Sequence, residues 1–140
     1  MKNTALEWTR EYSIETSAPP ETLWRIFGDV PGWKKWNAGI ERIEMHGPFS
    51  VGSEFLMQPP GQEPVVSRLI EVRENESFVD ETRVNDLIVR VAHRIVRLSA
   101  HRSRVTFTVE AIGPDCAEIG SAVSSDFPDV LQSLVSLAES

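Results

Sequence analysis

Short stretches with a hydrophobic period of two fill the middle of the chain and constrain its fold more than any other feature. They cover residues 40–46, 54–58, 65–73, 77–84, 87–98 and 104–111, and turn-forming residues such as Gly47-Pro48 and Pro59-Pro60-Gly61 separate them. Alternation of apolar and polar residues is typical of a strand with one buried face and one face in water. Consecutive strands joined by such short connections form antiparallel meanders. The sequence therefore predicts a long antiparallel meander.

The N-terminal part predicts one more strand followed by two short helices. Residues 6–16 alternate, with Leu6, Trp8, Tyr12 and Ile14 on one side and Glu7, Thr9, Glu11, Ser13 and Glu15 on the other. The segment 17–21 contains two prolines and an acidic residue, which are typical of the start of a helix. Gly28 is expected to end this helix, and Asp29 to cap a second one that carries Trp33 and Trp36.

Residues from Pro114 onward show a helical period. One apolar stripe contains Cys116, Ile119, Val123, Phe127, Val130 or Leu131, Leu134 and Ala138. Pro128 is expected to kink this helix. A long helix that is apolar on one side has to bury that side, and the concave face of the meander is the only large surface available. The sequence thus predicts an α+β fold in which a sheet wraps around a C-terminal helix.

The predicted order of a strand, two short helices, six strands and a long terminal helix is that of the helix-grip fold. The sequence resembles the polyketide cyclase/dehydrase-like family of the START-like (SRPBCC) superfamily over nearly its whole length. The resemblance is carried by Ala18-Pro19-Pro20-Glu21-Thr22-Leu23-Trp24, the pair Trp33 and Trp36, Gly47-Pro48-Phe49, Val51-Gly52-Ser53, Phe78-Val79-Asp80-Glu81-Thr82-Arg83 and Ile112-Gly113-Pro114. It implies a single α+β, Bet v 1-like domain over residues 1–140, with a seven-stranded antiparallel sheet and an enclosed apolar ligand. No catalytic motif of the family transfers residue by residue.

The turns of the meander predict which polar side chains point toward the helix. A two-residue loop at 85–86 sets the register of the strands on either side of it and places Asp80 and His93 inward. The preceding turn near 74–75 is expected to place Arg68 inward as well. On this register Asp80 lies diagonal to both Arg68 and His93, within reach of long side chains, in an otherwise apolar interior.

A charge buried without a partner is strongly destabilising, so this cluster requires a reason. One interpretation is functional: Arg68 binds a carboxylate, enolate or phenolate, and His93, oriented by Asp80, transfers a proton. The other is structural, with an ion pair at the sheet edge or a histidine bonded to a backbone carbonyl. The sequence leaves both open.

The expected ligand contacts are apolar and come from the strands and from the helices. They are Trp33, Trp36, Phe55, Met57, Phe78, Val91, Phe107, Val123 and Phe127. The two tryptophans either cover an aromatic ligand at the entrance to the space between the sheet and the long helix or attach the short helices to the sheet. The other side chains either line a cavity or fill it completely.

Composition and charge argue against nucleic acid as a partner. The chain of 140 residues has 41% apolar and 25% charged residues, which fits one globular domain. Its net charge of -7 repels a phosphate backbone, and its basic residues are scattered apart from a small patch of Arg25, Lys34 and Lys35. We therefore expect no nucleic-acid partner.

The cysteine count, the positions of the histidines and the hydropathy argue against disulfide bonds, metal sites and membrane spans. A single cysteine, Cys116, excludes an intramolecular disulfide and a cysteine-based zinc site, and the three histidines lie on different predicted elements. No apolar run reaches the roughly 18 residues of a membrane span, and residues 1–5 lack the apolar stretch of a signal peptide. The sequence predicts a cytoplasmic protein without a metal, a cofactor or an integral membrane segment.

Three functions remain open. The first is binding of one small hydrophobic molecule, aromatic, polyketide-like or lipid-like, between the sheet and the last helix, by a monomer or a homodimer. The second is a cofactor-free cyclase or dehydratase, a lyase or isomerase, in which Arg68, Asp80 and His93 stabilise charge and transfer protons. The third is a protein-interaction module with a filled core, which predicts an exposed apolar patch.

Overall fold

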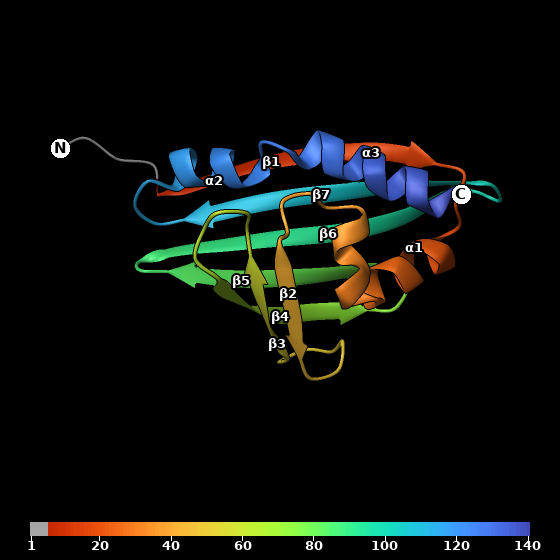
Figure 1. The fold of residues 1–140 in the computed structure, drawn as a ribbon. Coiled ribbons are helices and arrows are strands. Elements are labelled where there is room, and N and C mark those ends of the chain that lie inside the picture. The colour runs from red at the N-terminus through yellow and green to blue at the C-terminus, as the bar shows by residue number, and fades with distance from the viewer. Residues whose placement is uncertain (1–5) are drawn as a thin grey trace.

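The computed structural model describes residues 6–140, and Figure 1 shows its helices on one side of a single sheet. In chain order the elements are β1 (Glu7–Thr16), α1 (Pro20–Gly28), the 3-10 helix η1 (Val30–Lys35), β2 (Arg42–His46), β3 (Glu54–Gln58), β4 (Val65–Arg73), β5 (Ser77–Val84), β6 (Leu87–Ser99), β7 (Arg102–Ile112), α2 (Cys116–Ser124) and α3 (Phe127–Ala138). The predicted strands and the two short helices are all present. Residues 1–5, which entered the argument on a signal peptide, lie outside the described residues.

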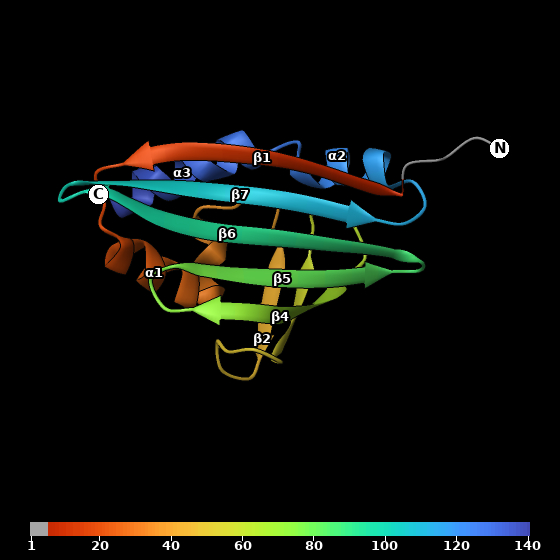
Figure 2. The same cartoon turned by 180° about the vertical axis from the view of Figure 1, so that it is seen from behind.

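The strand order confirms the predicted meander and places the N-terminal strand beside the last one. The sheet is antiparallel with the order β1-β7-β6-β5-β4-β3-β2. Seen from both sides, α2 and α3 run along β1 and β7, whereas α1 and η1 cover one end of the sheet (Figures 1 and 2). The sheet bends so that β2 and β3 cross in front of the central strands in Figure 1. This is the expected α+β helix-grip fold. In residues 6–140 there is no helix long and apolar enough to cross a membrane.

The core lies between the concave face of the sheet and the helices. Alternate residues of β7, from Val105 through Phe107 to Val109, are buried because they face the helices. Phe107 lies opposite Tyr12 of β1 and opposite His93 of β6, so the register of β7 places a histidine beside an aromatic ring in the core.

The register between β4 and β5 differs from the expected one. Next to the connecting turn the pairing is as expected, but a β-bulge at Ile70 adds one residue to β4. Beyond the bulge, Leu69 instead of Ile70 lies opposite Asp80. Because side chains alternate along a strand, this shift by one residue exchanges the two faces of β4. The expected inward position of Arg68 is therefore wrong, and Ser67 and Leu69 are buried in its place.

The C-terminal helical segment is divided into two helices. Helical structure ends at Ser124 and resumes at Phe127, so the expected kink at Pro128 is replaced by a break. Pro128 lies in the first turn of α3, where a proline leaves no backbone hydrogen bond unmade.

The face that α2 turns to the sheet also differs from the expected stripe. Its buried residues are Cys116, Gly120 and Ser124. Gly120 packs directly on Trp8: a Cβ atom at this position would lie 2.3 Å from Cε3 of the indole ring, so only glycine permits the approach. Ile119 and Val123 lie beside the buried row and remain 37% and 40% exposed. Their expected burial is therefore wrong, because the close contact at Gly120 sets the rotation of the helix.

Candidate functional site

Aromatic side chains from helices and strands meet where the concave face of the sheet reaches α1 and η1. This aromatic cluster consists of Phe27, Trp33, Trp36, Phe55, Phe78, His93, Phe107 and Phe127. The ring centroid of Phe27 lies 5.1 Å from that of Phe78 and 6.4 Å from that of Phe107, which places Phe27 at its centre. The structure thereby brings together most of the expected ligand contacts.

His93 lies inside this cluster and is held on two sides. Its ring stacks on that of Phe78 with centroids 3.9 Å apart and an interplanar angle of 6°. Its Nδ1 atom is 3.2 Å from the backbone oxygen of Phe78. Because a carbonyl oxygen only accepts hydrogen bonds, we assign the proton of the neutral ring to Nδ1. The other nitrogen, Nε2, faces Oδ2 of Asp80 at 4.0 Å.

Burial shifts the pKa values of Asp80 and His93 in opposite directions. Desolvation raises the pKa of Asp80 to about 7. Desolvation lowers the pKa of His93 to about 3, against the opposing effect of the bond to Phe78, and the positive charge of Arg94 lowers it further. Near neutral pH the side chain of His93 is therefore uncharged, while the carboxyl group of Asp80 is present in both its protonated and its ionised form. A group that titrates near the working pH is suited to general acid and base catalysis.

Asp80 faces the concave side of the sheet among apolar neighbours. Its side chain is 14% exposed, and within residues 6–140 it accepts no hydrogen bond. In the register, Leu69 and Val91 lie on either side of it. An ionised carboxylate in such surroundings is unfavourable, which is the physical cause of its raised pKa.

Two hydroxyl groups, of Ser67 and Thr82, lie next to Asp80 on the concave face. The Oγ atom of Ser67 and the Oγ1 atom of Thr82 are 2.6 Å apart, and the two residues lie opposite each other in β4 and β5. Sequence reasoning missed Ser67 because it assumed an unbroken alternation in β4. The adjacent apolar residues Leu69 and Ile70 interrupt that alternation and were the available signal for a bulge.

Arg68, the third member of the expected cluster, lies on the opposite face of the sheet. Its side chain is 59% exposed and forms an ion pair with Glu54 at 3.4 Å. The bulge separates it from Asp80 and His93, so it has no part in the site on the concave face.

The two tryptophans expected to cover a ligand differ in their hydrogen bonding. The indole nitrogen of Trp33 donates to the backbone oxygen of Phe27 at 2.9 Å, which fixes η1 to α1. The indole nitrogen of Trp36 is equally buried and has no hydrogen-bond partner in the described part of the chain. Trp33 thus follows the packing interpretation, while packing does not account for the polar atom of Trp36.

The remaining expected contacts are less enclosed. Met57 of β3 and Val91 of β6 are half-buried, on the concave face. Val123 of α2 is 40% exposed, as described above. Apolar surface is therefore left uncovered beside the aromatic cluster.

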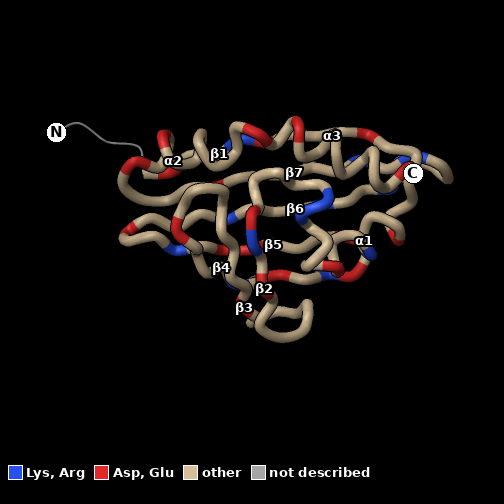
Figure 3. The backbone as a smooth tube through the Cα atoms, in the orientation of Figure 1, with Lys and Arg blue, Asp and Glu red and all other residues tan. Residues whose placement is uncertain are grey.

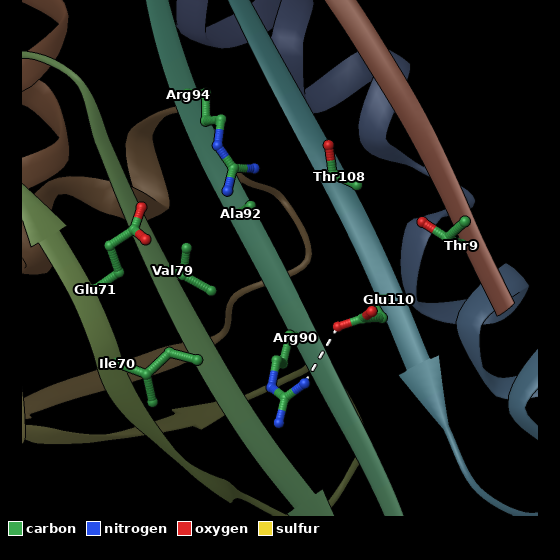
Figure 4. A pocket seen from close by; sticks show the side chains of 9 residues that line it. All are labelled: Thr9, Ile70, Glu71, Val79, Arg90, Ala92, Arg94, Thr108 and Glu110. Carbon is green, nitrogen blue, oxygen red and sulfur yellow. Dashed lines mark hydrogen bonds and ion pairs between the residues drawn. The ribbon is translucent and has the colours of Figure 1, made fainter. Parts of the chain in front are cut away.

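Two hollows on the molecular surface lie away from this cluster. One, of about 350 Å³, is on the convex face of the sheet; Figure 4 shows its polar rim, where Arg90 and Glu110 form an ion pair at 3.3 Å. The other, of about 310 Å³, lies between α1, η1 and the end of α3 and is bordered by Arg25 and Lys35. Neither is lined by an expected ligand contact.

Charged residues of both signs are spread over the described part of the chain. In Figure 3, blue segments with Lys or Arg are interspersed with red segments with Asp or Glu. In the described residues there is no group of three His, Cys, Asp or Glu side chains that could hold a metal ion.

A family model described as polyketide cyclase/dehydrase and lipid transport matches residues 7–139, which include all the strands and helices described above. Among curated proteins no sequence matches.

Several solved structures have the same fold. The Zhui aromatase/cyclase of a Streptomyces strain has a TM-score of 0.80 and 14% identity, over 95% of this chain and 94% of that one. A START superfamily protein from Mycobacterium smegmatis has a TM-score of 0.76 and 14% identity, over 94% and 97% of the two chains. Norcoclaurine synthase from Thalictrum flavum, in complex with dopamine and hydroxybenzaldehyde, has a TM-score of 0.72 and 14% identity, over 94% and 86%. At these identities the likeness shows the fold alone.

Proposed function

Because the chain belongs to the polyketide cyclase/dehydrase and lipid transport family, we propose that it binds one small apolar molecule that carries a polar group. The molecule lies on the concave face of the sheet, beside the aromatic cluster and against Met57 and Val91. Its polar group reaches the Asp80–His93 pair.

The pair of Asp80 and His93 in apolar surroundings carries this proposal. The carboxyl group is mostly buried and without a hydrogen bond from the described residues, and Nε2 of His93 lies 4.0 Å from it. Buried polar groups that lack partners destabilise a fold. A ligand hydroxyl or carbonyl group between or beside them supplies the missing bond, so recognition of a polar atom accounts for the Asp80 carboxyl group and for Nε2 of His93, whereas Nδ1 of His93 already bonds the Phe78 backbone.

The names of two neighbours in fold support an aromatic ligand, and the family description, which includes lipid transport, supports a lipid-like one. One is named an aromatase/cyclase, and another is complexed with dopamine and hydroxybenzaldehyde, both of which are aromatic molecules with polar groups. The half-buried side chains of Met57 and Val91 offer apolar surface to such a ligand beside the aromatic cluster.

Thermal shift and native mass spectrometry with 2-naphthol, 2-acetylnaphthalene and dodecanoic acid test the proposal. We expect at least one of them to give a one-to-one adduct and to raise the melting temperature by several degrees. Asp80→Ala should weaken that binding, and Asp80→Asn serves if the alanine variant does not fold. Arg68→Ala on the convex face is the matched control and should bind as the wild type does. No adduct and no shift with any of the three, together with concentration-dependent self-association, would instead favour the interaction module.

A proton-transferring enzyme is the second candidate, and the raised pKa of Asp80 favours it. In a dehydration, the Asp80 carboxylate takes a proton from the carbon next to a carbonyl group and then gives it to the departing hydroxyl group. The C–H and C–O bonds break, a C=C bond forms, and water leaves without a redox change. Nε2 of His93, which carries a lone pair, faces the carboxyl group of Asp80 at 4.0 Å.

A β-hydroxy ketone with a naphthyl ring tests this second candidate, because its dehydration creates an enone with a stronger ultraviolet absorbance. An enzyme should convert it with a rate that depends on one group near pH 7. Asp80→Asn should lose that turnover, whereas Arg68→Ala should keep it. Tight binding without turnover would assign the protein to the binding function.

A further inference from the structure

The indole nitrogen of Trp36 is one of two fully buried side-chain polar atoms that lack a hydrogen bond in residues 6–140; the other is Oγ of Ser103. The two cases differ chemically. A serine hydroxyl group both donates and accepts and can rotate, whereas an indole N–H only donates and is fixed by its ring. Trp36 is 3% exposed, so water does not reach this donor from the surface. Buried donors are nearly always paired, and an orphaned one requires an explanation.

Trp33 provides an internal comparison, because it lies three residues earlier and its ring centroid is 6.0 Å from that of Trp36. Its own N–H is satisfied by the backbone oxygen of Phe27. An indole ring can therefore fill this part of the core and still have its N–H hydrogen-bonded. A phenylalanine at position 36 would keep most of the apolar contact without burying a donor.

The position of Trp36 links it to the proposed binding site. Its ring centroid lies 6.1 Å from that of Phe27 and 6.5 Å from that of Phe107. The same two rings border His93, at 6.1 and 4.6 Å. The rings of Phe27 and Phe107 therefore neighbour both the unpaired donor of Trp36 and the ring of His93.

We infer that Trp36 selects the chemical class of the ligand by donating its indole N–H to an oxygen acceptor on an aromatic molecule. This inference rests on the proposed binding function and narrows it: the ligand is an aryl ketone, phenol or aryl ether, not a hydrocarbon. A ligand without an oxygen at that place leaves the donor unpaired in the complex as well as in the free protein. Relief of one unsatisfied buried donor favours the oxygenated ligand about tenfold or more.

Two probes of nearly the same shape test this: 2-acetylnaphthalene and 2-isopropenylnaphthalene, in which a C=CH2 group replaces the C=O group. The full chain labelled with 15N gives indole signals from its four tryptophans, which Trp→Phe variants assign. We expect the ketone to bind at least tenfold more tightly than the hydrocarbon and to move the N–H signal of Trp36 downfield. The carbonyl stretching frequency of the bound ketone should fall relative to its value in an alkane solvent.

Trp36→Phe should bring the affinities for the two probes within about twofold of each other, mainly by weakening ketone binding. Trp24→Phe is the matched control. Trp24 contacts Phe27 from α1, outside the proposed contacts, and its loss should keep the preference for the ketone. If Trp36→Phe does not fold, the signal shift and the carbonyl frequency in the wild type decide alone.

Three outcomes overturn the inference. Equal affinity for the two probes with an unmoved Trp36 signal contradicts it while leaving the binding function intact. A Trp36 N–H that still exchanges with bound water in the ketone complex assigns the bond to water. If neither naphthalene binds, the aromatic class is wrong; dodecanoic acid binding would then retain the proposed function, and no binding by any probe would remove both.

Discussion

Nε2 of His93 lies 4.0 Å from Oδ2 of Asp80, while Nδ1 of the same ring is bonded to the backbone of the residue on which it stacks. The bond to Phe78 assigns the proton to Nδ1, so the nitrogen that faces the carboxyl group carries a lone pair. The arrangement is that of a neutral histidine beside a protonated carboxyl group. An ion pair would require the charged form of both groups, which burial disfavours.

This arrangement predicts that removal of His93 makes stability fall as the pH rises. Burial raises the pKa of Asp80 from its ordinary value of 3.8 to about 7, so the folded state prefers the protonated form. Its contribution to stability is fully present below about pH 4 and is lost as the pH rises to about 7. In His93→Phe we expect a loss of roughly 2 to 4 kcal/mol over this range. The midpoint of urea unfolding, measured at intervals of pH, gives the result, and a flat profile would contradict it.

Removal of Asp80 predicts the opposite trend. The pKa of His93 is lowered by burial from 6.5 to about 3, so its contribution is present above about pH 6.5 and is lost as the pH falls. Asp80→Asn should therefore lose stability between about pH 6.5 and 4. In the wild type the two trends offset each other over this range, so its unfolding midpoint should change less than that of either variant.

The shift of β4 at the bulge predicts different effects for two neighbouring residues. Ser67→Ala breaks the partly buried bond of 2.6 Å to Thr82 and should destabilise the fold by about 1 kcal/mol. Arg68→Ala removes only an exposed ion pair with Glu54 and should change stability by less than about 0.5 kcal/mol. Chemical unfolding of both variants measures the difference. A larger loss in Arg68→Ala than in Ser67→Ala would speak against the shifted register.

The packing of α2 predicts a sharp difference between two glycines. Gly120→Ala places a methyl group 2.3 Å from Cε3 of Trp8 and should destabilise the protein by roughly 1 to 3 kcal/mol, because the helix has to move away from β1. Gly28→Ala is the control, since a Cβ atom there has nothing within 4 Å. Its effect should be within about 0.5 kcal/mol. Equal melting temperatures for the two variants would show that α2 has more room than described.

The two tryptophans next to η1 predict a difference in stability that does not depend on any ligand. Trp33→Phe loses the bond to the Phe27 backbone and leaves a buried carbonyl group with one partner fewer. Trp36→Phe loses no hydrogen bond in the described chain and removes an unsatisfied donor. Both substitutions remove a similar area of aromatic ring, so this loss cancels in the comparison. Trp33→Phe should therefore be the less stable variant by roughly 1 to 2 kcal/mol in equilibrium unfolding. The reverse order would mean that Trp36 has a protein partner.

Local patterns in the sequence were sufficient for the strands, the two short helices and their order, but not for the division of the C-terminal helical segment into α2 and α3. Alternation, prolines and turn residues predicted every strand and both short helices, and the loop at 85–86 predicted the pairing of β5 with β6 that places Asp80 and His93 on one face. These features depend on neighbours close in the chain, which is why they can be read without the fold. The resemblance in motifs added the helix-grip arrangement and the family.

Tertiary packing decided what these local patterns left open. The bulge at Ile70 moved Arg68 to the convex face, and the contact of Gly120 with Trp8 turned Ile119 and Val123 away from the core. Tertiary packing also determined that the N–H of Trp33 has a hydrogen-bond partner, while that of Trp36 has none in the described residues. A one-residue shift in a strand, or the rotation of a helix, changes no local preference but exchanges which side chains are buried. The sequence by itself thus determined the strands, their order and the common face of Asp80 and His93, and only contacts between distant segments determined that Ser67 and not Arg68 joins them on the concave face.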